Sequence, residues 1–279
     1  MTEVDVLVIG SGSSGEYAAG TLLAAGKSVA IAEHSRVGGD CIFHACIPTK
    51  TLLHAANLYE KMRTAASYGL PAPQATADYS QVKAYKDSVI EPLGEGRAES
   101  WRNKGAIVLQ ATARFRSPTE FDVGDETVKA AKTIICTGSR PSVPPVDGLE
   151  EAGYITNIEA LELTNLPESL AIIGGGPIGI EFGQLFSAFG CQITIYELSE
   201  RLLPLEDDEI SSTCEAVMAS KGIRIHTKAK VVRLEKTPGG KSITFEDAQG
   251  RRSTATHAEV LVATGRKARF DELNLEAAG

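Results

Sequence analysis

The chain contains two copies of one glycine pattern, with an offset of 164 residues between the first glycine of each copy. An apolar run leads into GSGSSG at 10–15, and another leads into GGGPIG at 174–179. Each copy continues through an expected helix to a second apolar run that is followed at once by an acid, Glu33 or Glu197. One such pattern is weak evidence, but two complete copies indicate two dinucleotide-binding βαβ units.

The three glycines of each copy have separate roles in such a unit. The first allows a tight turn out of the strand, the second lets the backbone approach a pyrophosphate, and the third lets helix and strand pack closely. The following helix presents free N–H groups to phosphate, and the acid can accept hydrogen bonds from ribose hydroxyls. The residues predicted to bind nucleotide in the two copies are Gly10, Gly12, Ser14, Gly15, Glu33, Gly174, Gly176, Ile178, Gly179 and Glu197.

A cysteine pair, Cys41 and Cys46, lies just after the first unit in the segment GGDCIFHACIPTK, residues 38–50. In a reducing compartment such a local pair is more often catalytic or metal-binding than structural. A disulfide needs Cα atoms about 5.5 Å apart, closer than five positions on an ideal helix, so we expect a distorted turn between them. Pro48 marks a helix start just after Cys46, and a helix N-terminus favours a thiolate.

Charge and hydropathy exclude several classes of partner. The net charge of −8 and the pI near 5.3 argue against nucleic acid or an anionic membrane surface. No apolar run approaches the roughly 20 residues that a membrane span needs. The acidic start at 1–5 has no basic and apolar leader, so we expect no secretory signal and a cytoplasmic location.

The remaining pattern predicts the elements that connect and follow the two copies. Helices are expected at 48–66, 79–103 (broken near 91–94) and 206–220. Strands are expected at 106–123 (short and antiparallel, with a turn at 117–118), 133–136 (buried), 228–234, 242–245 and 259–263, and a linker at 141–145. Two of these strands run into similar glycine turns, Thr137-Gly138 and Thr264-Gly265.

Together these residues resemble the pyridine nucleotide–disulfide oxidoreductases of the dihydrolipoamide dehydrogenase, glutathione reductase and mercuric reductase type. The redox motif of that family, Gly-Gly-x-Cys-x4-Cys-[Ile/Val]-Pro-x-Lys, is reproduced at 38–50. Both glycine patterns, the turns at 137 and 264, and the stretch ELSERLLPLED at 197–207 also fit. The resemblance covers nearly the whole chain and is greatest to dihydrolipoamide dehydrogenase, whose second glycine-rich helix matches 174–183.

This resemblance implies an α/β fold with two Rossmann-like dinucleotide-binding domains, parallel sheets and small antiparallel β-meanders. Residues 1–145 would be the first part of an FAD-binding domain, 146–265 an NAD-binding domain, and 266–279 the start of a return to the FAD domain. The C-terminal dimerisation domain of the family would be absent, and the full-length protein would be a homodimer. We therefore expect the chain to be truncated.

The resemblance also assigns roles to single residues. Cys46 would lie against the flavin as the charge-transfer thiolate, and Cys41 would form the mixed disulfide with a lipoamide-like substrate. Lys50 would lie near the flavin and Glu181 near the nicotinamide, where an ion pair between them is plausible. Further cofactor-binding residues implied by the motifs are Gly39, Thr137, Gly138 and Gly265.

Several alternatives stay open. The residues between the cysteines, Ile-Phe-His-Ala, depart from the family pattern and leave a mercuric-reductase-like or other disulfide reductase as the rival to a lipoamide enzyme. A catalytically incomplete nucleotide-binding fragment is also open, because the His–Glu acid–base pair of the family is missing. A zinc site from Cys41, His44, Cys46 and His54 is disfavoured by its irregular spacing. Glu197 favours NAD over NADP, because a carboxylate repels a 2′-phosphate, although Arg201 is near.

Overall fold

The computed structural model describes residues 1–72 and 76–279, which divide into two compact units. The first unit consists of Met1–Pro48, Ser88–Arg140 and Lys267–Gly279, and the second of Thr49–Asp87 and Pro141–Arg266. Two boundaries between the units fall within helices, α3 (Cys46–Thr64) and α4 (Tyr79–Gly94). The other two fall within strands that pair with each other, β7 (Ser139–Pro141) and β15 (Arg266–Ala268). The division into an FAD-binding part (1–145 and 266–279) and an NAD-binding part (146–265) concerns which nucleotide each part binds. It stays a prediction.

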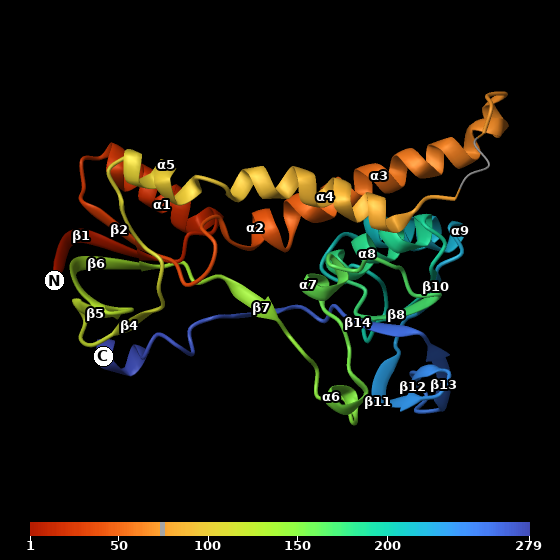
Figure 1. Cartoon of the computed structure of the whole chain (residues 1–279). Coiled ribbons are helices and arrows are strands. Elements are labelled where there is room, and N and C mark those ends of the chain that lie inside the picture. The colour runs from red at the N-terminus through yellow and green to blue at the C-terminus, as the bar shows by residue number, and fades with distance from the viewer. Residues whose placement is uncertain (73–75) are drawn as a thin grey trace. The chain divides into compact units, whose positions relative to one another are not determined.

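The first unit is built on a six-stranded sheet in the order β3-β2-β1-β6-β5-β4 (Figure 1). Strand β1 (Thr2–Ile9) lies between β2 (Val29–Ala32) and β6 (Glu126–Ile135), and both pair with it in parallel. The outer strand β3 (Ile107–Leu109) is parallel to β2, whereas β5 (Glu120–Val123) and β4 (Ala113–Phe115) form an antiparallel meander beside β6. The meander and parallel sheet agree with the predicted α/β class.

Alternate residues of β1 pack into two separate cores because successive side chains of a strand point to opposite faces. Val6 and Val8 pack in a cluster with Trp101, whereas Leu7 packs in a cluster with Phe121. The helices of this unit are α1 (Ser13–Ala24), α2 (Gly39–Phe43), α5 (Arg97–Asn103), the first residues of α3, the end of α4 and the 3-10 turn η2 (Leu275–Ala278).

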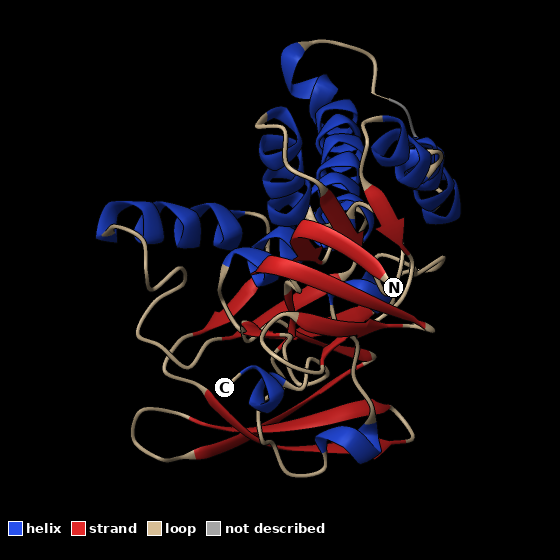
Figure 2. Ribbon diagram, turned by 90° about the vertical axis from the view of Figure 1, so that its left-hand side faces the viewer, coloured by secondary structure: helices blue, strands red, loops and turns tan. Residues whose placement is uncertain are grey.

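The second unit repeats the parallel part of this plan. Its four-stranded sheet has the order β10-β9-β8-β14, with every neighbouring pair parallel. A separate antiparallel sheet of three strands follows (Figure 2). The strands are β8 (Ser169–Ile173), β9 (Gln192–Tyr196), β10 (Arg224–His226), β14 (Glu259–Val262), and, in the antiparallel sheet, β11 (Lys230–Thr237), β12 (Gly240–Glu246) and β13 (Arg252–His257).

Helix α8 (Pro177–Ala188) forms the centre of the apolar core of the second unit. Phe182, Leu185 and Phe186 of this helix are almost fully buried and pack in one cluster with Leu52 of α3. The other helices of the unit are α6 (Leu149–Ala152), α7 (Asn157–Ala160), α9 (Asp208–Ser220) and the 3-10 turn η1 (Ala65–Tyr68), with the larger part of α3 and the first half of α4.

The repeat seen in the sequence extends to the register of the strands. Ile9 is opposite Ala32 in the β1–β2 pair, and Ile173 is opposite Tyr196 in the β8–β9 pair. The second pair of residues lies 164 positions after the first, which is the same offset as between the two glycine patterns. The two βαβ units therefore hold their glycine turns and their acids in equivalent places.

Several predicted elements differ from those observed. The run 106–123 was expected to be wholly antiparallel, but β3 pairs in parallel with β2 because it follows a helical crossover, not a hairpin. The predicted buried strand 133–136 is the end of the longer β6, and Ile135 is 46% exposed. The helix expected at 79–103 is interrupted at 95–96, directly after Gly94, which agrees with the break predicted near 91–94. Strands β10 and β13 were not predicted.

Candidate functional site: two glycine turns and a cysteine pair

The first glycine turn has the geometry that the pattern predicts. Gly10 has a φ of +99°, and a Cβ built on it would lie 2.2 Å from the carbonyl oxygen of Cys136 on the neighbouring strand. A Cβ on Gly15 would lie 1.9 Å from the Gly10 carbonyl oxygen. Only glycine fits at either position, because backbone atoms cannot move aside as a flexible side chain can.

The second turn repeats these contacts. Gly174 has a φ of +111°, and its Cβ would lie 2.4 Å from the Ala263 carbonyl oxygen. A Cβ on Gly179 would lie 2.1 Å from the Gly174 carbonyl oxygen. The predicted roles of the first and third glycines, a tight turn and close packing of helix on strand, are therefore confirmed in both copies.

The middle glycines are less enclosed than the first and third glycines. Gly176 has nothing within 4 Å of a Cβ position, and the nearest atom to that of Gly12 is the Gly39 Cα at 3.9 Å. Each is the N-cap of its helix, α1 or α8, and neither helix has a side-chain cap. The N–H groups in the first turn of each helix, which in α8 follow Pro177, are thus available to a pyrophosphate, and this cradle fits a dinucleotide at each turn. Ser14 is exposed at the first turn, and Ile178 packs against the core at the second.

The two acids are buried and held by backbone amides. Glu33 is 5% exposed and Glu197 is 8% exposed. Glu33 accepts hydrogen bonds from the amides of Ser11 and Ser35, both at 2.9 Å. Glu197 accepts equivalent bonds from the amides 164 positions later, 175 and 199, both at 2.6 Å. Each carboxylate therefore lies beside its own glycine turn, where a ribose would lie next to a bound pyrophosphate.

Each of the two Thr-Gly turns is hydrogen-bonded to a segment that is distant from it in the sequence. The Thr137 hydroxyl donates to the Arg269 carbonyl, and the Arg269 amide donates to the Gly138 carbonyl at 3.0 Å. In the second unit the Thr264 hydroxyl donates to the Ser142 carbonyl at 2.6 Å, and the Ser142 amide donates to the Gly265 carbonyl at 2.8 Å. These turns have a structural function, and their predicted cofactor contacts stay predictions.

The cysteine pair lies across a break between two helices. Cys41 is in the short helix α2, which ends at Phe43, and His44 leaves the helical conformation with φ −134° and ψ 4°. A new helix, α3, begins at Cys46. The distorted turn predicted between the cysteines is confirmed. Cys41 is half-buried, whereas Cys46 is exposed at the first position of α3.

Two of the residues between the cysteines, Phe43 and His44, make contacts with polar side chains. His44 Nδ1 lies 3.4 Å from Asp40 Oδ1, with both side chains partly exposed. The Arg36 guanidinium lies 4.1 Å from the centre of the Phe43 ring. Neither Asp40 nor Arg36 was identified from the sequence, because the contacts depend on how α2 packs.

Lys50 and Glu181 meet within the second unit. Lys50 Nζ of α3 donates to Glu181 Oε1 of α8, and the two side chains are 60% and 30% exposed. The ion pair that the resemblance implied is confirmed. That Lys50 lies near the flavin and Glu181 near the nicotinamide stays a prediction. In the described parts of the chain, 1–72 and 76–279, no group of three or more His, Cys, Asp or Glu residues is arranged to hold a metal ion.

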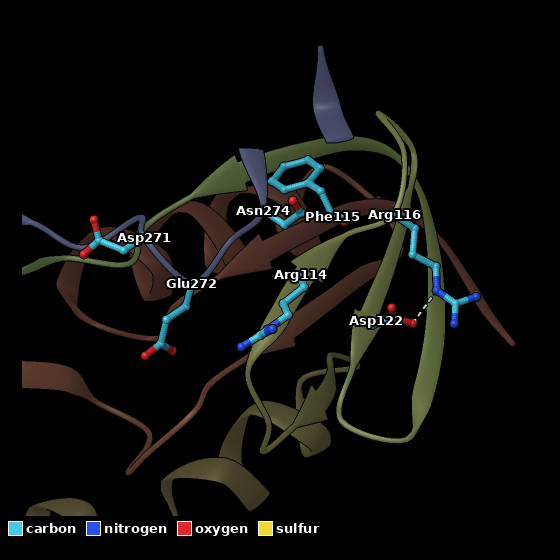
Figure 3. A pocket seen from close by; sticks show the side chains of 7 residues that line it. All are labelled: Arg114, Phe115, Arg116, Asp122, Asp271, Glu272 and Asn274. Atoms are coloured by element: carbon cyan, nitrogen blue, oxygen red, sulfur yellow. Dashed lines mark hydrogen bonds and ion pairs between the residues drawn. The ribbon is translucent and has the colours of Figure 1, made fainter. Parts of the chain in front are cut away.

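A further feature of the first unit is a polar recess. It is lined by Arg114, Phe115, Arg116, Asp122, Asp271, Glu272 and Asn274 (Figure 3). Arg116 Nε pairs with Asp122 Oδ1 at 2.5 Å, and Asn274 donates to the Phe115 carbonyl at 3.0 Å. None of the predicted site residues lines this recess. Among the helices of the described residues, none is both long and apolar enough to cross a bilayer.

Comparison with known proteins gives consistent relatives for the whole chain. Residues 4–279 match the family profile described as pyridine nucleotide-disulphide oxidoreductase. A dihydrolipoyl dehydrogenase of Bacillus subtilis is 35% identical over 279 residues, covering 98% of this chain and 60% of that protein. A mercuric reductase of Lysinibacillus sphaericus is 33% identical over 276 residues, covering 99% of this chain and 50% of that protein.

A solved structure has the same fold. The HOCl-induced flavoprotein disulfide reductase RclA from Escherichia coli superposes with a TM-score of 0.84 at 28% identity, covering 98% of this chain and 59% of that one. The chain thus spans between half and three fifths of the length of these three relatives. The two glycine turns and the cysteine pair agree with the family profile, which matches residues 4–279. The chain therefore belongs to the pyridine nucleotide-disulphide oxidoreductase family.

Proposed function

We propose that this chain carries the nucleotide sites and the redox cysteines of an FAD-dependent dithiol–disulfide oxidoreductase that uses NAD. The observation that carries the proposal is the position of Cys41 and Cys46, which follow the first glycine turn and lie across a break between two helices. A nucleotide fold alone would need no such pair, and a structural pair would not leave Cys46 exposed.

The residues of the first turn would hold FAD, and those of the second would hold NAD. Gly12 and Gly176 leave the helix N-termini open to a pyrophosphate, and the buried Glu33 and Glu197 would receive ribose hydroxyls. When bound, FAD supplies two-electron exchange between a nicotinamide and a disulfide. The other steps belong to residues of this chain.

Disulfide exchange would be carried out by the two cysteines. The Cys41 thiolate attacks one sulfur of a substrate disulfide, so that a mixed disulfide forms and one substrate thiol leaves. Cys46 then attacks the Cys41 sulfur, which releases the second substrate thiol and closes the Cys41–Cys46 disulfide. The electron pair of the protein dithiol ends on the substrate dithiol. The N-terminus of α3 supports the second step, because its partial positive charge favours a thiolate at Cys46, the attacking group in that step.

The choice of NAD over NADP has a further support in the second unit. Arg201 lies four residues after Glu197, but its guanidinium pairs with Asp208 and donates to the Glu206 carbonyl at 2.9 Å. A guanidinium held in this way is not directed to a 2′-phosphate. Glu197 therefore governs the preference at this site, and a carboxylate favours the ribose hydroxyls of NAD.

The substrate class is proposed to be a lipoamide-like disulfide or dithiol, with Hg²⁺ or another disulfide as the rival. Relatives named dihydrolipoyl dehydrogenase and mercuric reductase match at almost the same identity, 35% and 33%. The residues 42–45 between the cysteines depart from the family pattern and leave the rival in place. The full-length protein is proposed to be a cytoplasmic homodimer.

The test is the visible absorption spectrum of the purified chain with FAD, before and after anaerobic NADH. The expected result is a flavin spectrum that gains a long-wavelength charge-transfer band, and loses that band in Cys46→Ser but keeps the flavin. A protein that binds NADH but never flavin would overturn the redox proposal and leave a nucleotide-binding module. A following assay with lipoamide, glutathione disulfide and Hg²⁺ identifies the substrate class.

A further inference from the structure

Ser11 lies between the first two glycines of the first turn and is completely buried. Its hydroxyl donates a hydrogen bond to Glu33 Oε2 at 2.7 Å. The same hydroxyl accepts a hydrogen bond from the Gly38 amide at 3.2 Å. One side chain therefore connects the acid at the end of β2 to the first residue of the redox segment, defined as residues 38–46.

The redox segment also rests directly on the first glycine turn. Gly39 has a φ of +66°, and a Cβ built on it would lie 2.5 Å from the Gly12 Cα. On the other side, a Cβ on Gly38 would lie 3.2 Å from the Arg97 side chain, which is held by Glu16 through two hydrogen bonds of 2.6 and 2.5 Å. The start of the segment is thus enclosed between the turn and Arg97, and Ser11 supplies the hydrogen bond to it from the turn.

The second copy shows that the hydroxyl is not needed for the turn itself. Gly175 occupies the place of Ser11, and its amide makes the same bond to the acid, Glu197 Oε2, at 2.6 Å. A Cβ at Gly175 would lie 2.4 Å from a Leu202 methyl group, so a side chain is excluded there. The turn and its acid therefore form without a hydroxyl in the copy that has no redox segment.

The acid in the first copy is fully engaged. Glu33 Oε2 accepts from the amide and the hydroxyl of Ser11, and Oε1 accepts from the Ser35 amide and lies 3.0 Å from His34 Nδ1. A carboxylate offers about four lone-pair sites, so a ribose hydroxyl that donates to Glu33 must replace one of these partners. His34 is half exposed and can turn away at little cost. The Ser11 hydroxyl would then stay on both Glu33 and Gly38 while a nucleotide binds.

We propose that Ser11 is a positioning residue that fixes the redox segment, and with it Cys41, to the nucleotide-recognising acid of the first copy. This role rests on the function proposed above, since it gives the segment its place relative to the nucleotide site. Loss of the hydroxyl leaves the turn folded but frees the Gly38 amide, so the segment opens more often than the rest of its unit.

The experiment is amide hydrogen exchange, read by mass spectrometry, on the 279-residue chain. Four variants separate the hydroxyl from the shape of the side chain: Ser11→Ala, the equally branched pair Ser11→Thr and Ser11→Val, and Ser35→Ala as a control that keeps its amide bond to Glu33. We expect exchange in residues 38–45 to become about tenfold faster in Ser11→Ala and Ser11→Val, as for the loss of one buried hydrogen bond. Ser11→Thr is expected to exchange more slowly than Ser11→Val, and peptides from 174–183 are expected to be unchanged in every variant.

A second measurement follows the cysteine instead of the backbone. In a Cys46→Ser background, the rate at which iodoacetamide modifies Cys41 is expected to rise severalfold in Ser11→Ala and to recover in Ser11→Thr relative to Ser11→Val. Equal rates in Thr and Val variants, or faster exchange spread evenly over the first unit, would overturn the proposal, because the hydroxyl would then serve only general stability. If these effects appear but NADH produces no charge-transfer band, the redox function fails while the positioning role stands.

Discussion

Lys50 Nζ donates a hydrogen bond to Glu181 Oε1, so that the first half of α3 is ion-paired to α8, the helix that follows the second glycine turn. Both side chains are partly in solvent, and exposed ion pairs stabilise a fold by only about 0–1 kcal/mol. Cys46, the first residue of the same helix, is proposed above to be redox-active, so we expect the pair to serve the chemistry more than the fold. This predicts that its removal separates activity from stability.

Lys50→Met is therefore expected to lower the rate at which NADH reduces the flavin-loaded protein by about tenfold or more. This corresponds to roughly 1.4 kcal/mol of activation free energy. The free energy of unfolding is expected to fall by less than about 1 kcal/mol. Stopped-flow absorbance and urea unfolding give the two numbers. Lys61→Met, which removes an exposed charge from the same helix, is the control, and an equal loss of rate in both variants would refute the role of Lys50.

The third and the second glycine of the second turn, Gly179 and Gly176, predict different results for substitution by alanine. Gly179→Ala forces a Cβ to within 2.1 Å of a backbone oxygen, and we expect it to cost about 3 kcal/mol of unfolding free energy or to prevent folding. Gly176→Ala meets nothing within 4 Å, so its stability is expected to change by less than about 1 kcal/mol. Its affinity for NADH, measured by fluorescence titration, should nevertheless fall, since the new methyl group occupies the pyrophosphate cradle. Tight binding by Gly176→Ala would contradict this reading of the site.

Two histidines beside Tyr196 predict a loss of stability in mild acid. The Tyr196 hydroxyl lies 3.0 Å from His257 Nε2, and the His226 ring stacks on the Tyr196 ring at 5.3 Å. Burial, with Arg224 nearby, lowers the pKa of both histidines below the ordinary value of 6.5. The folded state thus binds fewer protons than the unfolded state once the pH falls below about 6.5, so acid favours unfolding.

The expected result is a urea midpoint that is flat from pH 8 to about 7 and falls steadily below about 6.5. His257→Gln removes one of the two groups and should reduce the slope in that range, whatever its effect at pH 8. A slope that is unchanged in His257→Gln would show that other groups cause the loss.

Cysteine reactivity is expected to differ sharply between the redox segment and the core. Burial raises the pKa of Cys191 to about 12 and also raises the pKa of Cys136 and Cys214. At pH 8 the Cys191 thiol is therefore almost entirely protonated, whereas Cys46 is exposed at a helix N-terminus. Alkylation of the native reduced protein should mark Cys46 first and Cys191 only after unfolding. Mass spectrometry of the peptides gives the order, and early modification of Cys191 would mean that the core around α8 opens readily.

Much of the site could be predicted from the sequence because its constraints are local. A glycine that must have positive φ, such as Gly10 or Gly174, is visible in the sequence, and so is an acid that follows a strand. The break between Cys41 and Cys46 also followed from the limits of disulfide geometry.

What the sequence did not reveal depends on contacts between distant segments. Ser11 is unremarkable in the pattern GSGSSG, and only the folded chain brings its hydroxyl to Gly38, 27 positions away. The parallel pairing of β3 was missed because an alternating run has the same appearance in either direction. The short β10 was missed because three residues are too few to give a period.

The equal offset of the two copies gives every position in the first turn a twin in the second, 164 residues later in the same molecule. A substitution in one copy can be matched by its counterpart in the other, under the same solvent, temperature and purification. Each substitution in one copy therefore has an internal control in the other copy. Ser11 and Gly175 are an equivalent pair of positions at which the two copies differ, so they show what the hydroxyl adds.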